Sequence, residues 1–99
     1  MVTEIAILNI RPGMGGAFEA SFEQARNIIR SMKGYLQHEL LKCMEEADKY
    51  ILIVQWQHLE DHTEGFRKSS EYQEWKKLLH HFYDPFPVVE HYQGTAKAA

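Results

Sequence analysis

Two short segments of this sequence place apolar side chains on both faces of the strand that each would form. Segment 3–11 contains the run Ile-Ala-Ile-Leu, and segment 50–54 reads Tyr-Ile-Leu-Ile-Val. Successive side chains of a strand point to opposite faces, so such a strand is fully buried only when both faces are covered. A fold for this chain therefore has to supply two covering layers.

A helix is expected between residues 15 and 32, and it supplies part of one layer. Its apolar residues recur at spacings typical of a helix, at Phe18, Phe22, Ala25, Ile29 and Met32. This period places them on a single stripe that can pack against a sheet. Gly34 follows as a natural C-terminal cap.

Three further strands are expected in the rest of the chain. Segments 35–44 and 49–57 flank the polar break 45–48, which suits an antiparallel hairpin connection. The last strand is expected at 88–92, beyond the region that reads as helical.

The helical region before that last strand is expected in two pieces. Leu59 and Phe66 belong to the first piece, and Ser70 with Gln73 three residues later forms a capping box that opens the second. Pro85 ends the region, because the residue before a proline avoids the helical conformation.

The order β-α-β-β-α-β predicts a ferredoxin-like α+β fold, with a four-stranded antiparallel sheet and both helices on one face. A single domain is expected over residues 1–93, followed by a flexible tail at 94–99. The helices cover only one sheet face, so a second copy of the chain is expected to cover the other. A homodimer also suits a chain of 99 residues, whose own core is small.

Charge and composition exclude several classes of partner. Eleven Lys and Arg against fourteen Asp and Glu give a net charge of −3, whereas a protein that binds nucleic acid is typically positively charged. The apolar run 50–54 is too short to span a membrane. The N-terminal residues lack the pattern of a signal peptide, so a cytoplasmic protein is expected. Cys43 is the single cysteine and cannot form an internal disulfide.

Several motifs in the second half of the chain resemble the antibiotic biosynthesis monooxygenase domain family. They are Trp56 followed by Glu60, the step Phe-Arg-Lys-Ser at 66–69, Glu-Tyr-Gln-Glu-Trp at 71–75 and Pro-Val-Val-Glu-His-Tyr at 87–92. With the elements before them, the resemblance covers nearly the whole chain. It implies a dimeric α+β barrel.

The resemblance also implies a monooxygenase that oxidises a small aromatic or quinol-type substrate with dioxygen, without metal or prosthetic group. In that chemistry the protein deprotonates the substrate, stabilises its anion and excludes water. His38 or His62 is then the candidate base. Arg67 is the candidate partner of the anion, and a solvated helix charge is the alternative interpretation of this arginine.

The resemblance further implies an apolar cavity for a flat aromatic substrate, with Trp56, Phe66, Tyr72 and Trp75 as candidate binding residues. Their simpler role is packing between sheet and helices. His91 is also a candidate binding residue, because a polar side chain in a covered strand requires either an interstrand hydrogen-bond network or a polar pocket.

No metal site is predicted. His58 and His62 are four residues apart, a spacing that can place two imidazoles on one helix face, but no third ligand follows at a useful distance. A solvated helix start is the favoured interpretation.

Haem degradation, known in one branch of this family, is disfavoured. That branch uses an Asn on the first strand, a Trp before the Arg-x-Ser step and a His ligand in the last helix. Here Asn9 lies about three residues late, Phe66 replaces the Trp, and the ligand position falls near Lys76, which has no lone pair for iron when protonated. A shifted ligand from His80 or His81 is the remaining alternative.

A second interpretation of the whole chain is a non-catalytic module that binds a ligand or serves in stress responses and shares only the fold. A cavity of about 300 Å³ or more with convergent polar groups distinguishes a site from a filled core. In a purely structural module, Trp56, Phe66 and Trp75 would fill that space.

Overall fold

The structure of the protein, a computed structural model, describes residues 1–96. Its elements in chain order are β1 (Val2–Asn9), α1 (Gly15–Arg30), β2 (Tyr35–Lys42), β3 (Lys49–Trp56), the π-helix η1 (Asp61–Phe66), α2 (Ser70–Leu79), the short 3-10 helix η2 (His80–Phe82) and β4 (Val89–Tyr92). Of the tail predicted at 94–99, residues 97–99 lie outside the described residues.

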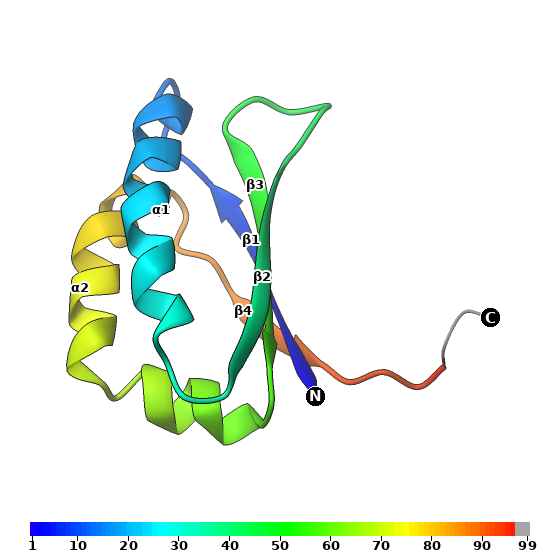
Figure 1. Cartoon of the computed structure of the whole chain (residues 1–99). Coiled ribbons are helices and arrows are strands. Elements are labelled where there is room, and N and C mark those ends of the chain that lie inside the picture. Colours follow the sequence, from blue (N-terminus) through cyan, green and yellow to red (C-terminus); the bar gives the residue numbers. More distant parts are fainter. Residues whose placement is uncertain (97–99) are drawn as a thin grey trace.

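The four strands form one sheet in the order β2-β3-β1-β4, and every neighbouring pair is antiparallel. Both α-helices pack on the same face of this sheet, seen edge-on in Figure 1. This arrangement confirms the ferredoxin-like α+β fold that the element order predicts.

Helix α1 forms as its apolar stripe predicts. Phe18, Phe22, Ala25 and Ile29 are all buried against the sheet. The helix ends at Arg30, two residues before the expected end. The chain then turns back toward β2 through Gly34, whose φ of +83° lies in the left-handed region that favours glycine.

The start of α2 corrects one detail of the sequence prediction. Ser69, and not Ser70, caps this helix, because the Ser69 hydroxyl accepts a hydrogen bond from the backbone N–H of Tyr72 at 3.1 Å. The hydroxyl of Ser70 instead donates to the carboxylate of Glu71. The predicted capping box at Ser70 and Gln73 is therefore wrong by one residue.

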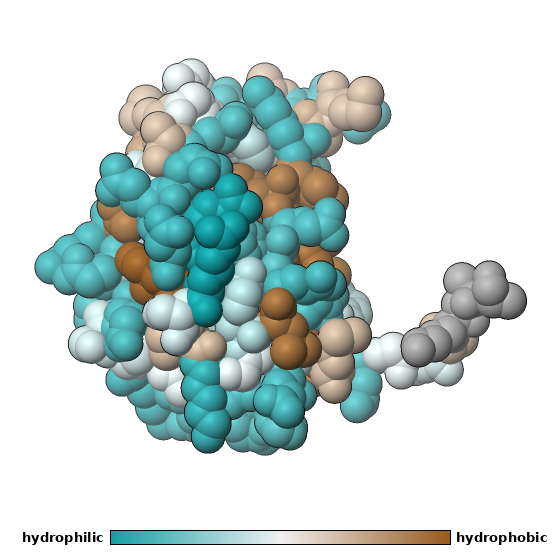
Figure 2. Space-filling model, viewed as in Figure 1, coloured by the Kyte–Doolittle hydropathy of each residue, from teal (hydrophilic) through white to brown (hydrophobic). Residues whose placement is uncertain are grey.

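Alternation along β1 divides the sheet into two faces. Glu4, Ala6 and Leu8 are buried beneath the helices, whereas Ile7 points to the opposite face and is 49% exposed. Strand β3 follows the same rule. In Figure 2, apolar side chains reach the surface on the right side, where Figure 1 shows the sheet turned away from the helices.

No helix within residues 1–96 combines the length and the apolarity that a membrane crossing requires.

Replacement of Gly34 by alanine should destabilise the protein by about 2 kcal/mol or more. An alanine at this position would be strained in the left-handed backbone conformation of Gly34. Its Cβ atom would also overlap the side chain of Asp61. The matched control is Gly16→Ala in α1, where an added Cβ meets no other atom and should stabilise by about 0.5–1 kcal/mol. Urea denaturation of both variants measures the difference, and equal stability would contradict this account of Gly34.

Candidate active site

A cavity of about 400 Å³ lies between the sheet and the segment that runs from η1 through α2 to residue 87. Its volume exceeds the roughly 300 Å³ at which small-molecule sites begin. Ala6, Leu8 and Leu52 from the two central strands form its apolar floor. The space thus stays open although Trp56 and Phe66 are buried beside it.

Aromatic rings form the walls of this cavity. Phe66, Tyr72, Trp75, Tyr83 and Phe86 all line it. The ring of Phe66 meets those of Tyr72 and Trp75 edge to face, at interplanar angles of 90° and 80°. Such walls suit a flat, largely apolar ligand.

The π-helix η1 delivers two polar side chains to the cavity. The backbone N–H of Arg67 donates to the carbonyl oxygen of His62 at 3.0 Å, an i→i+5 bond that widens the turn. His62 and Arg67 both line the cavity as a result. His62 is only 3% exposed, while Arg67 remains at the solvent edge.

Glu4 is a candidate site residue that the sequence interpretation missed. It is 6% exposed and lines the cavity from β1. The indole N–H of Trp56 donates to its Oε1 atom at 2.9 Å. The signal was present in the sequence, because alternation places Glu4 on the same strand face as Ala6 and Leu8.

His62 joins Glu4 to a second histidine. Its Nε2 atom lies 3.4 Å from Oε1 of Glu4, and its Nδ1 atom lies 2.7 Å from Nε2 of His91. The His62 ring also stacks on Trp56, with centroids 5.4 Å apart and an interplanar angle of 15°. His91 stands opposite Glu4 in the pairing of β4 with β1. It supports His62 from behind the cavity wall.

Burial changes the protonation of this cluster. Desolvation raises the pKa of Glu4 to about 6, although the hydrogen bond from Trp56 and the charge of Arg67 oppose the rise. Desolvation also lowers the pKa of His62 to about 3, with further lowering by the charges of Arg67 and His91. Near neutral pH, the cluster therefore holds an ionised Glu4 beside a neutral His62.

The ionised cluster has one consistent arrangement of hydrogens. Glu4 accepts hydrogen bonds, so the hydrogen of the neutral His62 ring is on Nε2 and points to the carboxylate. The Nδ1 atom of His62 then accepts from the Nε2–H group of His91. In this arrangement Nδ1 is hydrogen-bonded, and Nε2–H faces the carboxylate in a longer contact of 3.4 Å.

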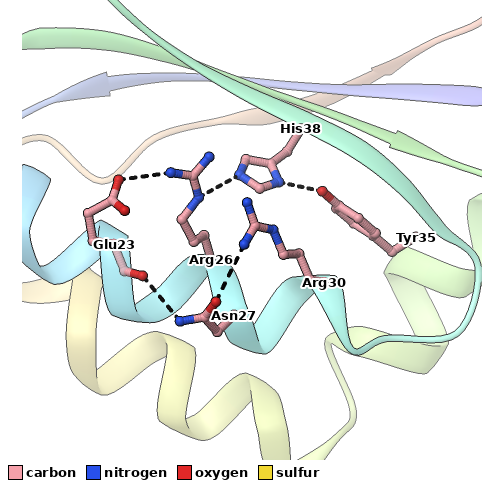
Figure 3. Close-up of polar contacts among 6 residues, drawn as sticks. All are labelled: Glu23, Arg26, Asn27, Arg30, Tyr35 and His38. Carbon is pink, nitrogen blue, oxygen red and sulfur yellow. Dashed lines mark hydrogen bonds and ion pairs between the residues drawn. The ribbon is translucent and has the colours of Figure 1, made fainter.

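His38, the other candidate base, lies elsewhere. It belongs to β2, where Arg26 donates from Nε to its Nε2 atom at 3.3 Å, so its own hydrogen is on Nδ1, 2.5 Å from the Tyr35 hydroxyl. Figure 3 shows this cluster between α1 and β2, with Arg30 beside it. Desolvation and the charges of the two arginines lower the pKa of His38. The structure does not bring His38 to the cavity.

The remaining predicted residues fall into two groups. Phe66, Tyr72, Trp75 and Arg67 line the cavity, whereas Trp56 lies fully buried behind it. His80 lines the cavity too, and packs against the rings of Tyr72 and Phe86.

His58 interacts with Asp61 at the surface and does not share a site with His62. Within residues 1–96, no three His, Cys, Asp or Glu side chains are arranged to hold a metal ion.

Comparison with known proteins identifies the family of this chain. The sequence profile of the family described as antibiotic biosynthesis monooxygenase matches residues 1–78. The chain belongs to this family. The resemblance inferred from the sequence motifs is thereby confirmed.

Individual members of the family illustrate the range of similarity. The uncharacterised protein YczJ of Bacillus subtilis (strain 168) is 63% identical over 95 residues, covering 96% of this chain and all of YczJ. A solved structure from Bordetella bronchiseptica, classed as an antibiotic biosynthesis monooxygenase, is 33% identical over 96% of this chain and 97% of its own, with a TM-score of 0.91.

More distant structures share the fold. SnoaB, a cofactor-independent oxygenase from Streptomyces nogalater, is 18% identical, with 99% of this chain and 94% of SnoaB covered and a TM-score of 0.74. At this identity the match establishes a common backbone architecture.

The low pKa of His62 should make the protein sensitive to acid. Between pH 6.5 and about 3, the unfolded chain binds a proton at this residue that the folded protein does not, so the free energy of unfolding falls as the pH falls. The His62→Gln variant lacks this contribution. Its unfolding free energy should fall less steeply, by up to about 1.4 kcal/mol per pH unit, in urea denaturation at a series of pH values.

Glu4 changes the pH dependence of the unfolding free energy in the opposite direction. Its raised pKa means that the folded protein binds the extra proton between pH 4.5 and about 6, which favours folding as the pH falls. Because Glu4 is present in both proteins, the comparison isolates His62. Equal slopes for wild type and His62→Gln would contradict a neutral, buried His62.

Proposed function

We propose that this protein is a homodimeric, cofactor-independent monooxygenase that oxidises a small phenol or quinol-type substrate with dioxygen. The observation that carries the proposal is the aromatic cavity with Arg67 at its edge and the Glu4–His62 pair in its wall. For a simple phenol the reaction balances as phenol plus O₂ giving quinone plus water. The substrate supplies all the electrons, so no further reductant is required.

The cavity provides what this chemistry needs from a protein. Aromatic walls hold the flat ring and keep water from it, which strengthens electrostatic interactions inside. Arg67 offers a cation to the phenolate oxygen, and the phenolate is the form that donates an electron to dioxygen. Family membership and the shared fold with the oxygenase SnoaB both support this assignment.

The open face of the sheet supports the homodimer. Ile5, Ile51 and Ile53 point to this face, as does Leu41, which is 44% exposed. Two grooves of about 410 and 200 Å³ lie there. A second copy of the chain would bury these side chains, which the helices of one copy cannot reach.

The activity is tested by oxygen uptake. A panel of phenols and quinols is incubated with the wild-type protein, and dioxygen consumption and product formation are recorded. Uptake with stoichiometric quinone and water supports the proposal. Binding of the same compounds without any uptake would overturn it in favour of the non-catalytic binding module.

Arg67→Met should lower the rate on an accepted substrate by about a hundredfold or more, because one charge-assisted contact to the anion is lost. Methionine keeps much of the aliphatic stem, so the melting temperature should barely change. The matched control is Lys68→Met, since Lys68 pairs with Glu64 on the surface and does not line the cavity. Full activity of Arg67→Met would remove this arginine from the mechanism.

Ile7→Glu should dissociate the homodimer. The side chain is half exposed in one copy, so a carboxylate there is tolerated by the fold but not by an apolar interface. The control is Leu59→Glu. Leu59 is exposed to a similar extent but lies just before η1, away from the open face of the sheet. Sedimentation should give twice 11.6 kDa for wild type and control, and 11.6 kDa for Ile7→Glu. A wild-type monomer would contradict the dimer.

A further inference from the structure

We propose that Glu4 is the catalytic base of the site: its carboxylate accepts the hydroxyl proton of the phenolic substrate, and the pair His62–His91 positions it for this role. The inference rests on the proposed function and deepens it. It assigns the proton transfer to a residue on β1 that the sequence motifs of the second half of the chain do not include.

Geometry selects Glu4 among the groups of the cavity. Its Oε1 atom accepts a hydrogen bond from the indole N–H of Trp56 and lies 3.4 Å from Nε2 of His62. No hydrogen bond from the described residues reaches Oε2, and the residue lines the cavity. One carboxylate oxygen is thus held in place while the other is left for a ligand.

His62 is not suited to accept the substrate proton itself. Its Nδ1 atom is hydrogen-bonded to His91, and its Nε2 atom lies 3.4 Å from Oε1 of Glu4, where a ring hydrogen rather than a lone pair suits the carboxylate. A proton from the substrate would displace one of these contacts and place a charge on a side chain that is 3% exposed. The ring instead orients the carboxylate.

His80 and the two cavity tyrosines are the other titratable groups. Burial raises the pKa values of Tyr72 and Tyr83, so both remain protonated and act as donors near neutral pH. Burial and the charge of Lys76 lower the pKa of His80, which weakens it as a base. His80 is therefore the competitor that the test has to exclude.

The proton transfer balances within one turnover. The O–H bond of the substrate breaks and an O–H bond forms at Oε2 of Glu4, which leaves a phenolate facing Arg67 and a neutral glutamic acid. After dioxygen has reacted with the phenolate, Glu4 returns this proton to the oxygen atom that leaves as water. The other hydrogen of that water comes from the oxidised ring carbon.

Charged and titratable groups approach Glu4 from every neighbouring element. They are His62 from η1, Arg67 directly after it, His91 from β4, Tyr72 from α2 and Tyr83 beyond η2. Arg67 favours the ionised carboxylate, as does the hydrogen bond from Trp56, and desolvation opposes it. The net result is a carboxyl group that is ionised near neutral pH and still basic enough to take a proton.

The test uses 3-nitrophenol, whose phenolate absorbs at longer wavelength than the neutral phenol. The titration is done in weakly buffered solution, above the pKa of Glu4 and below that of the free probe, with absorbance and released protons recorded together. Wild type should form bound phenolate with almost no proton released, because Glu4 captures it. Glu4→Gln should either bind the neutral probe or release about one proton for each phenolate formed.

The matched control is His81→Gln, because His81 is exposed and does not line the cavity, and this variant should capture the proton as the wild type does. Loss of proton capture in His80→Gln, with Glu4 intact, would assign the base to His80 instead. Release of one proton per bound phenolate by the wild type, proton capture by Glu4→Gln, or failure of the wild type to bind the probe would overturn the assignment. With an accepted substrate, Glu4→Gln should lower kcat/KM by about a hundredfold or more. It should also abolish the acid limb that Glu4 places near pH 6 in the profile of kcat/KM.

A second pair of variants tests the positioning role of His91. His91→Phe removes the N–H donor to His62, so the acid limb should move to higher pH, whereas His91→Gln keeps a donor and should shift it less. Identical profiles for the two variants would contradict this role. Proton capture without any oxygen uptake would overturn the proposed oxygenase while leaving Glu4 as the proton acceptor of a binding site.

Discussion

The pairing register of β1 with its two neighbours is the constraint on which the site depends. It places Glu4 opposite Val54 on β3 and opposite His91 on β4. Trp56 lies two residues beyond Val54 on the same face, within reach of the Glu4 carboxylate. A shift of one residue would turn Glu4 to the open face and separate all three side chains.

The buried polar groups of this site are stable only together. A buried carboxylate or imidazole costs free energy unless its hydrogen-bonding atoms find partners. Trp56 donates to Oε1 of Glu4, and His62 and His91 are hydrogen-bonded to each other. No fully buried side-chain nitrogen or oxygen atom of the described residues lacks a partner, and Oε2 of Glu4 is left to the cavity. Removal of one member leaves the others unsatisfied, so conservative replacements that keep a donor or acceptor are the informative ones.

Periodicity was sufficient to predict the fold. The stripe on α1 and the two-sided apolar strands identified the elements and the sheet, because local spacing decides which side chains share a face. Spacing could not choose between adjacent candidates, as Ser69 and Ser70 show. The π-helical turn was also beyond prediction, since it depends on the single i→i+5 bond from Arg67 to His62.

The candidate site was predictable only where one continuous stretch of the chain carries it. Phe66, Arg67, Tyr72 and Trp75 follow one another along the chain, and the structure places them around one cavity. Glu4 joins them from the opposite end of the sequence through strand pairing, a contact that no local pattern records. His38 and His62 were equal candidates in the sequence, because residue type alone does not indicate which neighbouring elements a histidine contacts in the fold.

The two faces of the sheet meet at the segment before β4. Phe86 and Pro87 line the cavity beneath the helices, and they also line the larger groove on the open face. Phe86 is 61% exposed and holds its position by packing against His80 and Tyr83. In the proposed homodimer, the partner would occupy this groove and press on the same two residues. Closure of the cavity and assembly of the dimer would then share one wall, so that the partner would add to the exclusion of water that the aromatic walls begin.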